Sequence, residues 1–113
     1  MLDDVTTVTL QTAMTALAQR QRASANNIAN VETPGYIAQR VSFEDSLRDA
    51  VSTGNPQGAS VTYSNSNDNS GVNGNNVNLS SEIVIDEETT MQNDLVAQAL
   101  TAKYGLISTV LHN

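Results

Sequence analysis

Residues 25–36 read ANNIANVETPGY, and this stretch decides how the N-terminal part of the chain folds. Asparagine competes with the helical backbone for hydrogen bonds and tolerates left-handed conformations, so Asn30 is expected to end a helix. Pro34 keeps Thr33 out of the helical region, and Pro34-Gly35 fits the central positions of a type II turn. Two interpretations stay open, a helix cap with a turn or a set of contacts to another chain. The candidate assembly residues are Asn26, Asn27, Ile28, Asn30, Thr33, Pro34, Gly35 and Tyr36.

A long helix is predicted to lead into this turn, over residues 4–30. Apolar side chains recur at spacings of three and four, which is typical of a packing seam, and alanines widen the apolar surface beside it. At about 1.5 Å per residue the helix would be roughly 40 Å long. Asp3 and Asp4 lie where acidic residues stabilise the positive end of the helix dipole. The seam residues are Leu10, Met14, Leu17, Gln21, Ser24, Ile28 and Val31, of which Gln21 and Ser24 are imperfections.

The middle of the chain is predicted to hold one short helix and one loop. Ser42 with Asp45 three residues later resembles a capping box, so a helix is expected from Ser42 to Val51, within the segment 37–51. Residues 52–79 are rich in Asn, Ser and Gly, and they are predicted to form a flexible loop because they can bury little apolar surface. Within that loop, residues 61–63 are compatible with a short strand.

A second long helical pattern occupies residues 80–113. Ser80 or Ser81 is expected to cap it, although Ile83-Val84-Ile85 favours a strand locally and allows a helix start as late as Asp86. Two neighbouring apolar faces follow along this helix. The first is formed by Met91, Leu95, Ala99, Ala102, Leu106 and Val110, and the second by Val96, Leu100, Ile107 and Leu111.

These elements predict a mainly α fold, in which two long terminal amphipathic helices pair into a coiled-coil-like bundle, with a short helix and a polar, flexible loop between them. The segments 1–36, 37–51, 52–79 and 80–113 would together form one assembly domain. Apolar residues surround more of each terminal helix than one partner can cover, which indicates packing against other chains. The residues expected to pack between subunits are Leu10, Met14, Leu17, Ile28, Leu95, Ala99, Ala102, Leu106 and Val110.

Composition argues against several classes of function. The chain has 113 residues, a formal net charge of −7 and no cysteine. That charge disfavours nucleic acid and anionic membrane surfaces, and the lack of cysteine excludes disulfides and thiolate zinc sites. The acidic start lacks the apolar core of a secretory signal, and no run approaches the roughly 20 apolar residues of a membrane span. His112 is the only histidine and stands next to the last residue, so no catalytic set, metal site, cofactor site or small-molecule substrate is expected.

Several motifs resemble one known family. The stretch 25–36 resembles the N-terminal signature of bacterial flagellar axial proteins, the subunits of rod, hook and hook-associated structures. Four further stretches are similar to segments of the proximal rod family of the FlgB type: FEDSLR (43–48), GNNVNL (74–79), QALT (98–101) and KYGL (103–106). The chain departs from the family pattern at Ile37, where lysine is usual, and at Ala97, where an aromatic residue is common.

The resemblance implies a structural subunit of the proximal rod of the flagellar basal body, which transmits torque from the membrane ring to the outer axial structure. Such a protein would be exported by the flagellar type III apparatus without a cleaved signal and would lie on the periplasmic side of the cell envelope. Its partners would be other rod proteins, copies of itself, and ring and export-gate components at the rod base. Two alternatives stay open, another rod subunit such as the C type, and a secreted helical adaptor or export-linked binding module.

Overall fold

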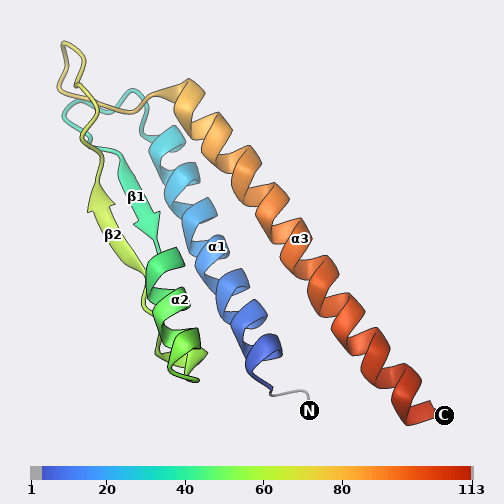
Figure 1. Ribbon diagram of the computed structural model, residues 1–113. Coiled ribbons are helices and arrows are strands. Elements are labelled where there is room, and N and C mark those ends of the chain that lie inside the picture. The colour runs from blue at the N-terminus through green and yellow to red at the C-terminus, as the bar shows by residue number, and fades with distance from the viewer. Residues whose placement is uncertain (1–3, 113) are drawn as a thin grey trace.

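The structure is a computed structural model that describes residues 4–112, with the side chains of Leu106, Ile107, Val110 and His112 left out. The predictions that concern Asp3, and the side chains of Leu106, Ile107 and Val110, therefore lie outside the described residues. The chain is mainly helical, as predicted, with two long terminal helices (Figure 1). Its elements are α1 (Val5–Ala29), β1 (Gln39–Ser42), α2 (Glu44–Ser52), the 3-10 turn η1 (Pro56–Gly58), β2 (Thr62–Asn65) and α3 (Leu79–His112).

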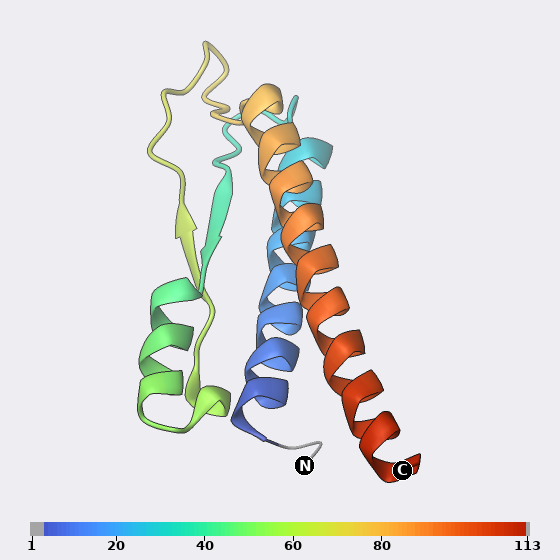
Figure 2. The ribbon, with the colours of Figure 1, turned by 45° about the vertical axis from the view of Figure 1, so that its right-hand side comes forward.

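Helix α1 forms the middle of an elongated molecule, with principal extents of 65 × 26 × 14 Å. The strand pair and α2 lie on one side of α1, and α3 runs along the other side, as two views agree (Figures 1 and 2). Helices α1 and α3 are antiparallel, because Gln21 near the end of α1 contacts Thr90 whereas Gln11 near its start contacts Tyr104. None of the described helices combines the length and the apolar character needed to cross a bilayer.

A small apolar core joins α1 to α2. Ala16 and Leu17 are each 3% exposed and pack with Phe43, which stands just before α2. Val96 of α3 packs against this cluster from the other side, so the core reaches across all three helices. Burial of a leucine and a phenylalanine side chain stabilises a fold by about 1.5–3 kcal/mol each, which makes this cluster a main source of monomer stability.

Arg20 holds α1 against the strand and α2 with several contacts at once. Its guanidinium donates two hydrogen bonds to the carbonyl oxygen of Val41, at 2.8 and 3.2 Å, and forms an ion pair with Glu44. It also lies 4.9 Å from the centroid of the Phe43 ring, within cation–π range. Partial burial raises the pKa of Glu44, yet hydrogen bonds from Arg20 and from backbone N–H groups outweigh it, so the net shift is downward.

Both ends of α1 are capped, and the cap at the C-terminal end is the predicted one. The Asp4 carboxylate accepts a hydrogen bond from the backbone N–H of Thr7 at 2.8 Å, so Asp4 is the N-cap and not a first-turn residue. Asn30 is the C-cap, which confirms the predicted helix end. The predicted turn is also confirmed, because the Tyr36 N–H donates to the Thr33 carbonyl at 3.2 Å and Gly35 has φ = +74°.

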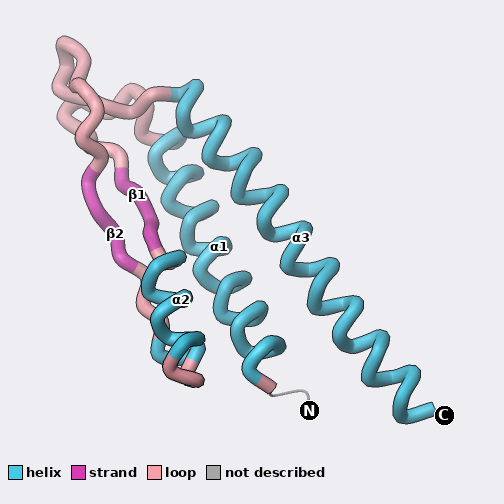
Figure 3. The backbone as a smooth tube through the Cα atoms, viewed as in Figure 1, coloured by secondary structure: helices cyan, strands magenta, loops and turns pink. Residues whose placement is uncertain are grey.

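The middle segment differs from the prediction in two ways. Residues 39–42 form β1, which pairs antiparallel with β2, and Ser42 lies opposite Thr62 in this ladder. The predicted capping box at Ser42 is therefore wrong: the residue belongs to the strand, α2 begins two residues later, and its N-cap is Phe43 without a side-chain hydrogen bond. The stretch expected to be loop contains η1 and β2 (Figure 3). The short strand suggested at 61–63 is present at Thr62–Asn65.

Helix α3 begins before Ile83-Val84-Ile85, although these three residues favour a strand. It starts at Leu79 and runs without a break through Ile83-Val84-Ile85, so the alternative start near Asp86 is wrong. Asn78 caps it in place of the expected Ser80 or Ser81, because the Asn78 carboxamide oxygen accepts from the Ser81 N–H at 3.1 Å. The strand preference of three β-branched residues is a weak effect, and contacts between α3 and α1 outweigh it.

Candidate assembly interface

At the asparagine-rich end of α1, the side chain of Asn27 is fully buried and lies at the centre of a hydrogen-bond network. Its amide nitrogen donates to the Gln39 carbonyl at 2.9 Å and to the Glu82 carboxylate at 3.1 Å. Its amide oxygen accepts from the Gln39 N–H at 3.0 Å and from the Tyr36 hydroxyl at 3.2 Å. One side chain thus forms hydrogen bonds with both the N–H and the carbonyl of Gln39 in β1, and also with Glu82 of α3.

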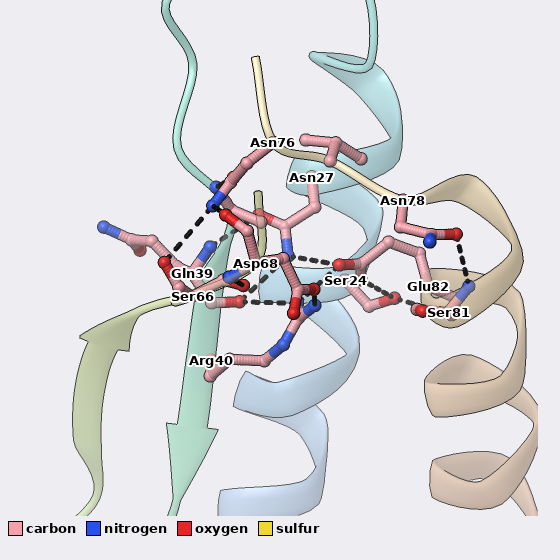
Figure 4. A network of polar contacts seen from close by, with 12 residues as sticks. Ser24, Asn27, Gln39, Arg40, Ser66, Asp68, Asn76, Asn78, Ser81 and Glu82 are labelled. Atoms are coloured by element: carbon pink, nitrogen blue, oxygen red, sulfur yellow. Dashed lines mark hydrogen bonds and ion pairs between the residues drawn. The ribbon is translucent and has the colours of Figure 1, made fainter. Parts of the chain in front are cut away.

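Glu82 of α3 is the second centre of this network, and it is also fully buried (Figure 4). Its carboxylate accepts from Ser24 and Asn27 of α1, and it pairs with the Arg40 guanidinium of β1. The Arg40 guanidinium also lies 3.6 Å from the carboxylate of Asp68, in the loop after β2. A buried carboxylate costs several kcal/mol unless it is paired and hydrogen-bonded, and here it is both. The network therefore fixes the position of α3 relative to α1 and β1.

The segment Gly74-Asn75-Asn76 folds back onto the turn that follows α1. The Asn75 side chain donates to the carbonyl oxygens of Asn30 and Thr33, each at 2.8 Å, and so satisfies acceptors at the end of α1. Its carboxamide oxygen accepts from the Val77 N–H at 2.8 Å. Two stretches that the sequence marks separately, 25–36 and 74–79, are therefore one structural unit.

Asn76 ties the same segment to the start of β1. Its amide oxygen accepts from the Ala38 N–H at 2.7 Å, and its amide nitrogen donates to the carbonyls of Ser66 and Asp68, each at 3.2 Å. Its backbone N–H donates to the Tyr36 carbonyl at 3.1 Å. Asn76 is 4% exposed, so these bonds are shielded from water.

Two glycines allow the backbones of these stretches to approach each other. Gly74 has φ = +80°, a conformation that L side chains rarely adopt, and a Cβ atom there would lie 3.3 Å from the Gly35 Cα. The Gly35 N–H also donates to the Asn73 carbonyl at 2.9 Å. The close approach explains why glycine occupies position 74.

The structure divides the candidate signature residues between interior and surface. Asn27 is internal, and Tyr36, Asn30 and Ile28 are half-buried. The residues that remain exposed are Asn26, Thr33, Pro34 and Gly35. The signature therefore has a clear role within the chain, and its exposed members lie at one end of the molecule, beside the start of α3 (Figure 1).

The expected inter-subunit residues are divided in the same way. Leu17 is buried in the chain's own core, whereas Leu10, Met14 and Ile28 are half-buried on α1. Leu95, Ala99 and Ala102 of α3 are exposed.

An exposed apolar stripe runs along the outside of α3. Counted from Val84 to Ala102, its five members are spaced by seven, four, four and three residues, which places them on one helix face. Met91 and Leu95 are each 65% exposed. Val96 and Leu100 lie on the different face that packs toward α1. We define the outer stripe of α3 as Val84, Met91, Leu95, Ala99 and Ala102.

The chemical character of the site is structural. A groove of about 310 Å³ lies between α1, β1 and α3, and its charged lining groups are Arg20, Arg40, Glu82 and Glu88, of which the first three are held in ion pairs. Within residues 4–112, no group of three His, Asp or Glu side chains is placed to hold a metal ion. The arrangement is suited to fixing helices in position.

Sequence reasoning missed Glu82, Arg40 and the role of Ser24. Ser24 was an apparent imperfection in the α1 seam, yet it is 2% exposed and donates to the Glu82 carboxylate at 3.1 Å. A matching signal was present on α3, because Glu82 shares a helix face with the buried residues Thr89 and Leu100. A polar residue in each of two facing seams is the pattern that predicts such a pair.

Comparison with known proteins gives a consistent family. Residues 9–36 match the model of a family described as flagella basal body rod protein. The chain is 27% identical over 118 aligned positions to the flagellar basal body rod protein FlgB of Bacillus subtilis (strain 168), covering 90% of this chain and 89% of that protein. It is 37% identical over 54 residues to the protein of the same name from Yersinia enterocolitica, covering 48% of this chain and 39% of that protein.

Proposed function

We propose that this chain, which belongs to the family of flagellar basal-body rod proteins, is built into the rod through the outer faces of its two terminal helices. The family is a structural one, so the chain is a structural rod subunit located in the flagellar basal body, and it is not an enzyme. Its exposed apolar surfaces are therefore candidate contacts with other rod subunits.

The outer stripe of α3 is the observation that supports this proposal most. Helix α3 packs against α1 with one face, while Met91 and Leu95 stay 65% exposed on another. Burial of apolar surface contributes about 25 cal/mol per Å², so covering this stripe would favour association strongly. A helix with two apolar faces, of which one neighbour covers only one, is expected to bind a second neighbour on assembly.

A neighbouring helix on the stripe would produce the coiled-coil-like bundle expected from the sequence. Leu106 and Val110 continue the same spacing along the chain and would extend the contact. On α1, the half-buried Leu10, Met14 and Ile28 would contribute at the edge of the bundle. Leu17 would act indirectly, because it holds the chain's own core together.

The asparagine-rich signature would control the geometry of assembly. Asn27 and Asn30 hold the end of α1, so they would set the angle at which α1 and α3 meet a neighbour. Asn26 and the turn Thr33–Tyr36 would supply direct contacts, since most of their side chains are exposed. The segments 1–36, 37–51, 52–79 and 80–113 would act as one assembly domain, in which the stretch 52–79 joins the helices.

The likeness to FlgB proteins supports a wider proposal about partners. The chain would contact other rod proteins and copies of itself, together with ring and export-gate components at the rod base. It would reach this place through the flagellar export apparatus, and in the finished rod it would transmit torque to the outer axial structure.

Deletion of the chain, followed by isolation of basal bodies, tests the proposed function. We expect loss of motility, basal bodies with rings and no rod, and the protein present in wild-type basal bodies. Complete flagella in the deletion strain would contradict the proposal and would favour a soluble adaptor instead.

A further inference from the structure

We propose that the outer stripe of α3 binds an amphipathic helix of a different chain, whose apolar seam is flanked by lysine or arginine. This inference rests on the proposed function and identifies the kind of partner that the same surface takes. The partner is defined by two properties of α3 together, an uncovered apolar face and the sign of the charges along one edge of that face and within it.

Acidic residues lie along one edge of the stripe and within it. Glu87 and Asp94 lie along the edge, Glu88 lies within the stripe, and all three side chains are exposed. None of these three carboxylates forms an ion pair with any of the residues that the structure describes. A helix that covers the stripe would bring its own flanking residues next to these charges, so it needs cations there.

Glu88 adds specificity because it interrupts the stripe itself. It follows Val84 by four residues and precedes Met91 by three, which is the spacing of a packing seam. A charged residue at one seam position lowers stability unless the partner supplies the opposite charge, and it thereby selects both partner and register. A lysine or arginine opposite Glu88 would satisfy it, whereas a purely apolar seam would leave its charge buried and unpaired.

A second copy of the chain does not offer such a surface. Four of its five basic residues, Arg20, Arg40, Arg48 and Lys103, already pair with acids of the same chain. The exposed side of α1 carries Arg22 and, among its large apolar residues, only Val5. Two α3 stripes facing each other would place like charges together. Copies of this chain therefore meet through other surfaces, and this stripe is left for a basic helix.

Binding of two synthetic helical peptides to the purified full chain tests the inference. The peptides share one leucine seam and differ only in their flanking residues, which are lysines in one and glutamates in the other. We expect the lysine peptide to bind at least about tenfold more tightly, with an affinity that falls as NaCl rises from about 0.05 M to about 0.5 M. Fluorescence anisotropy of labelled peptides measures both quantities.

Charge-reversal variants locate the binding surface. The triple substitution Glu87→Lys, Glu88→Lys and Asp94→Lys should reverse the preference toward the glutamate peptide. Asp86→Lys is the matched control, because Asp86 is an exposed acid of the same helix on a different face, and it should keep the preference for lysine. Circular dichroism of each variant verifies that the helices are retained.

Two results would overturn the inference. One is equal binding of both peptides, and the other is a concentration-dependent dimer of the chain that Leu95→Asp abolishes, since a second copy would then occupy the stripe. Either result leaves the proposed function intact as long as deletion removes the rod. Complete flagella in the deletion strain would instead remove the proposed function, whatever the peptides do.

Discussion

At the scale of single residues, Asn27 is the side chain on which the closure of the fold most depends. Its four hydrogen bonds join α1 to β1, to the turn and to α3. Removing them leaves the part-buried backbone groups of Gln39 and the buried carboxylate of Glu82 without one of their partners, which costs about 1–3 kcal/mol for each unsatisfied buried group. Position 27 thus carries much more of the stability than an ordinary helix-end asparagine.

Asn27→Ala is expected to lower the free energy of unfolding by about 3 kcal/mol or more. The neighbouring Asn26→Ala is the control, because Asn26 is exposed and alanine favours the helix, so its effect should stay within about 0.5 kcal/mol. Urea denaturation followed by circular dichroism measures both values. Equal stability of the two variants would contradict the assignment of Asn27 as the centre of the network.

Asp4 predicts a specific dependence of stability on pH. The hydrogen bond from Lys103, at 2.8 Å, and that from the Thr7 N–H lower the pKa of Asp4 from 3.8 to about 2. Because the folded pKa is below the unfolded one, this stabilisation is present above pH 3.8 and is lost as pH falls through about 2.

Asp4→Asn keeps the N-cap and removes the titrating group, so it isolates this effect. The melting temperature of the wild type should fall more steeply than that of Asp4→Asn between the ordinary pKa of 3.8 and pH about 2, as measured by thermal denaturation. Parallel curves for the two proteins over this interval would show that Asp4 has no such role.

At the scale of elements, the contact between the turn after α1 and the Gly74–Asn76 segment holds the two long helices together at one end. Gly74→Ala should cost about 1–3 kcal/mol, because alanine is strained at φ = +80° and its Cβ would press on Gly35. Gly71→Ala is the matched control, since a Cβ there meets its nearest atoms at an ordinary 3.6 Å. If both substitutions lower the urea midpoint equally, the close approach at Gly74 is not what matters.

The elements differ in how far the sequence predicts them. Helix α1 and its turn are predictable because apolar spacing, Asn30 and Pro34-Gly35 agree with each other. Strand β1 is not, because its four residues gain their ladder only from β2, some twenty residues further along. The early start of α3 has the same cause, since long-range contacts with α1 decide it and local preference does not.

The candidate site, too, is only partly predictable from the sequence. Its motifs are recognisable in the sequence, but their mutual contact is not, because side-chain amides give no periodic signal. In the sequence, Asn27 is one of several asparagines at a helix end and Glu82 is one of several acids near a helix start, whereas in the structure their side chains lie 3.1 Å apart. The two apolar faces of α3 were both expected from the sequence, except that Val84 was not among the predicted members, and the structure shows that the face of Val96 and Leu100 is the one that covers α1.

At the scale of the whole molecule, folding and assembly use different surfaces. Leu17 lies in the core, so a charge there would destabilise the chain itself and would not test assembly. Leu95 is 65% exposed in the single chain, so a charge at this position leaves the fold nearly unchanged and acts on partners. This separation allows assembly to be tested without loss of the subunit.

The most direct measurement is complementation of a deletion strain with Leu95→Asp or with Asp86→Lys, an exposed position of α3 on a different face. Both proteins should be produced at wild-type levels with wild-type circular dichroism. We predict that Leu95→Asp is absent from isolated basal bodies and fails to restore motility, whereas Asp86→Lys is incorporated and restores it. Normal incorporation of Leu95→Asp would contradict the assignment of the outer stripe of α3 as an assembly surface.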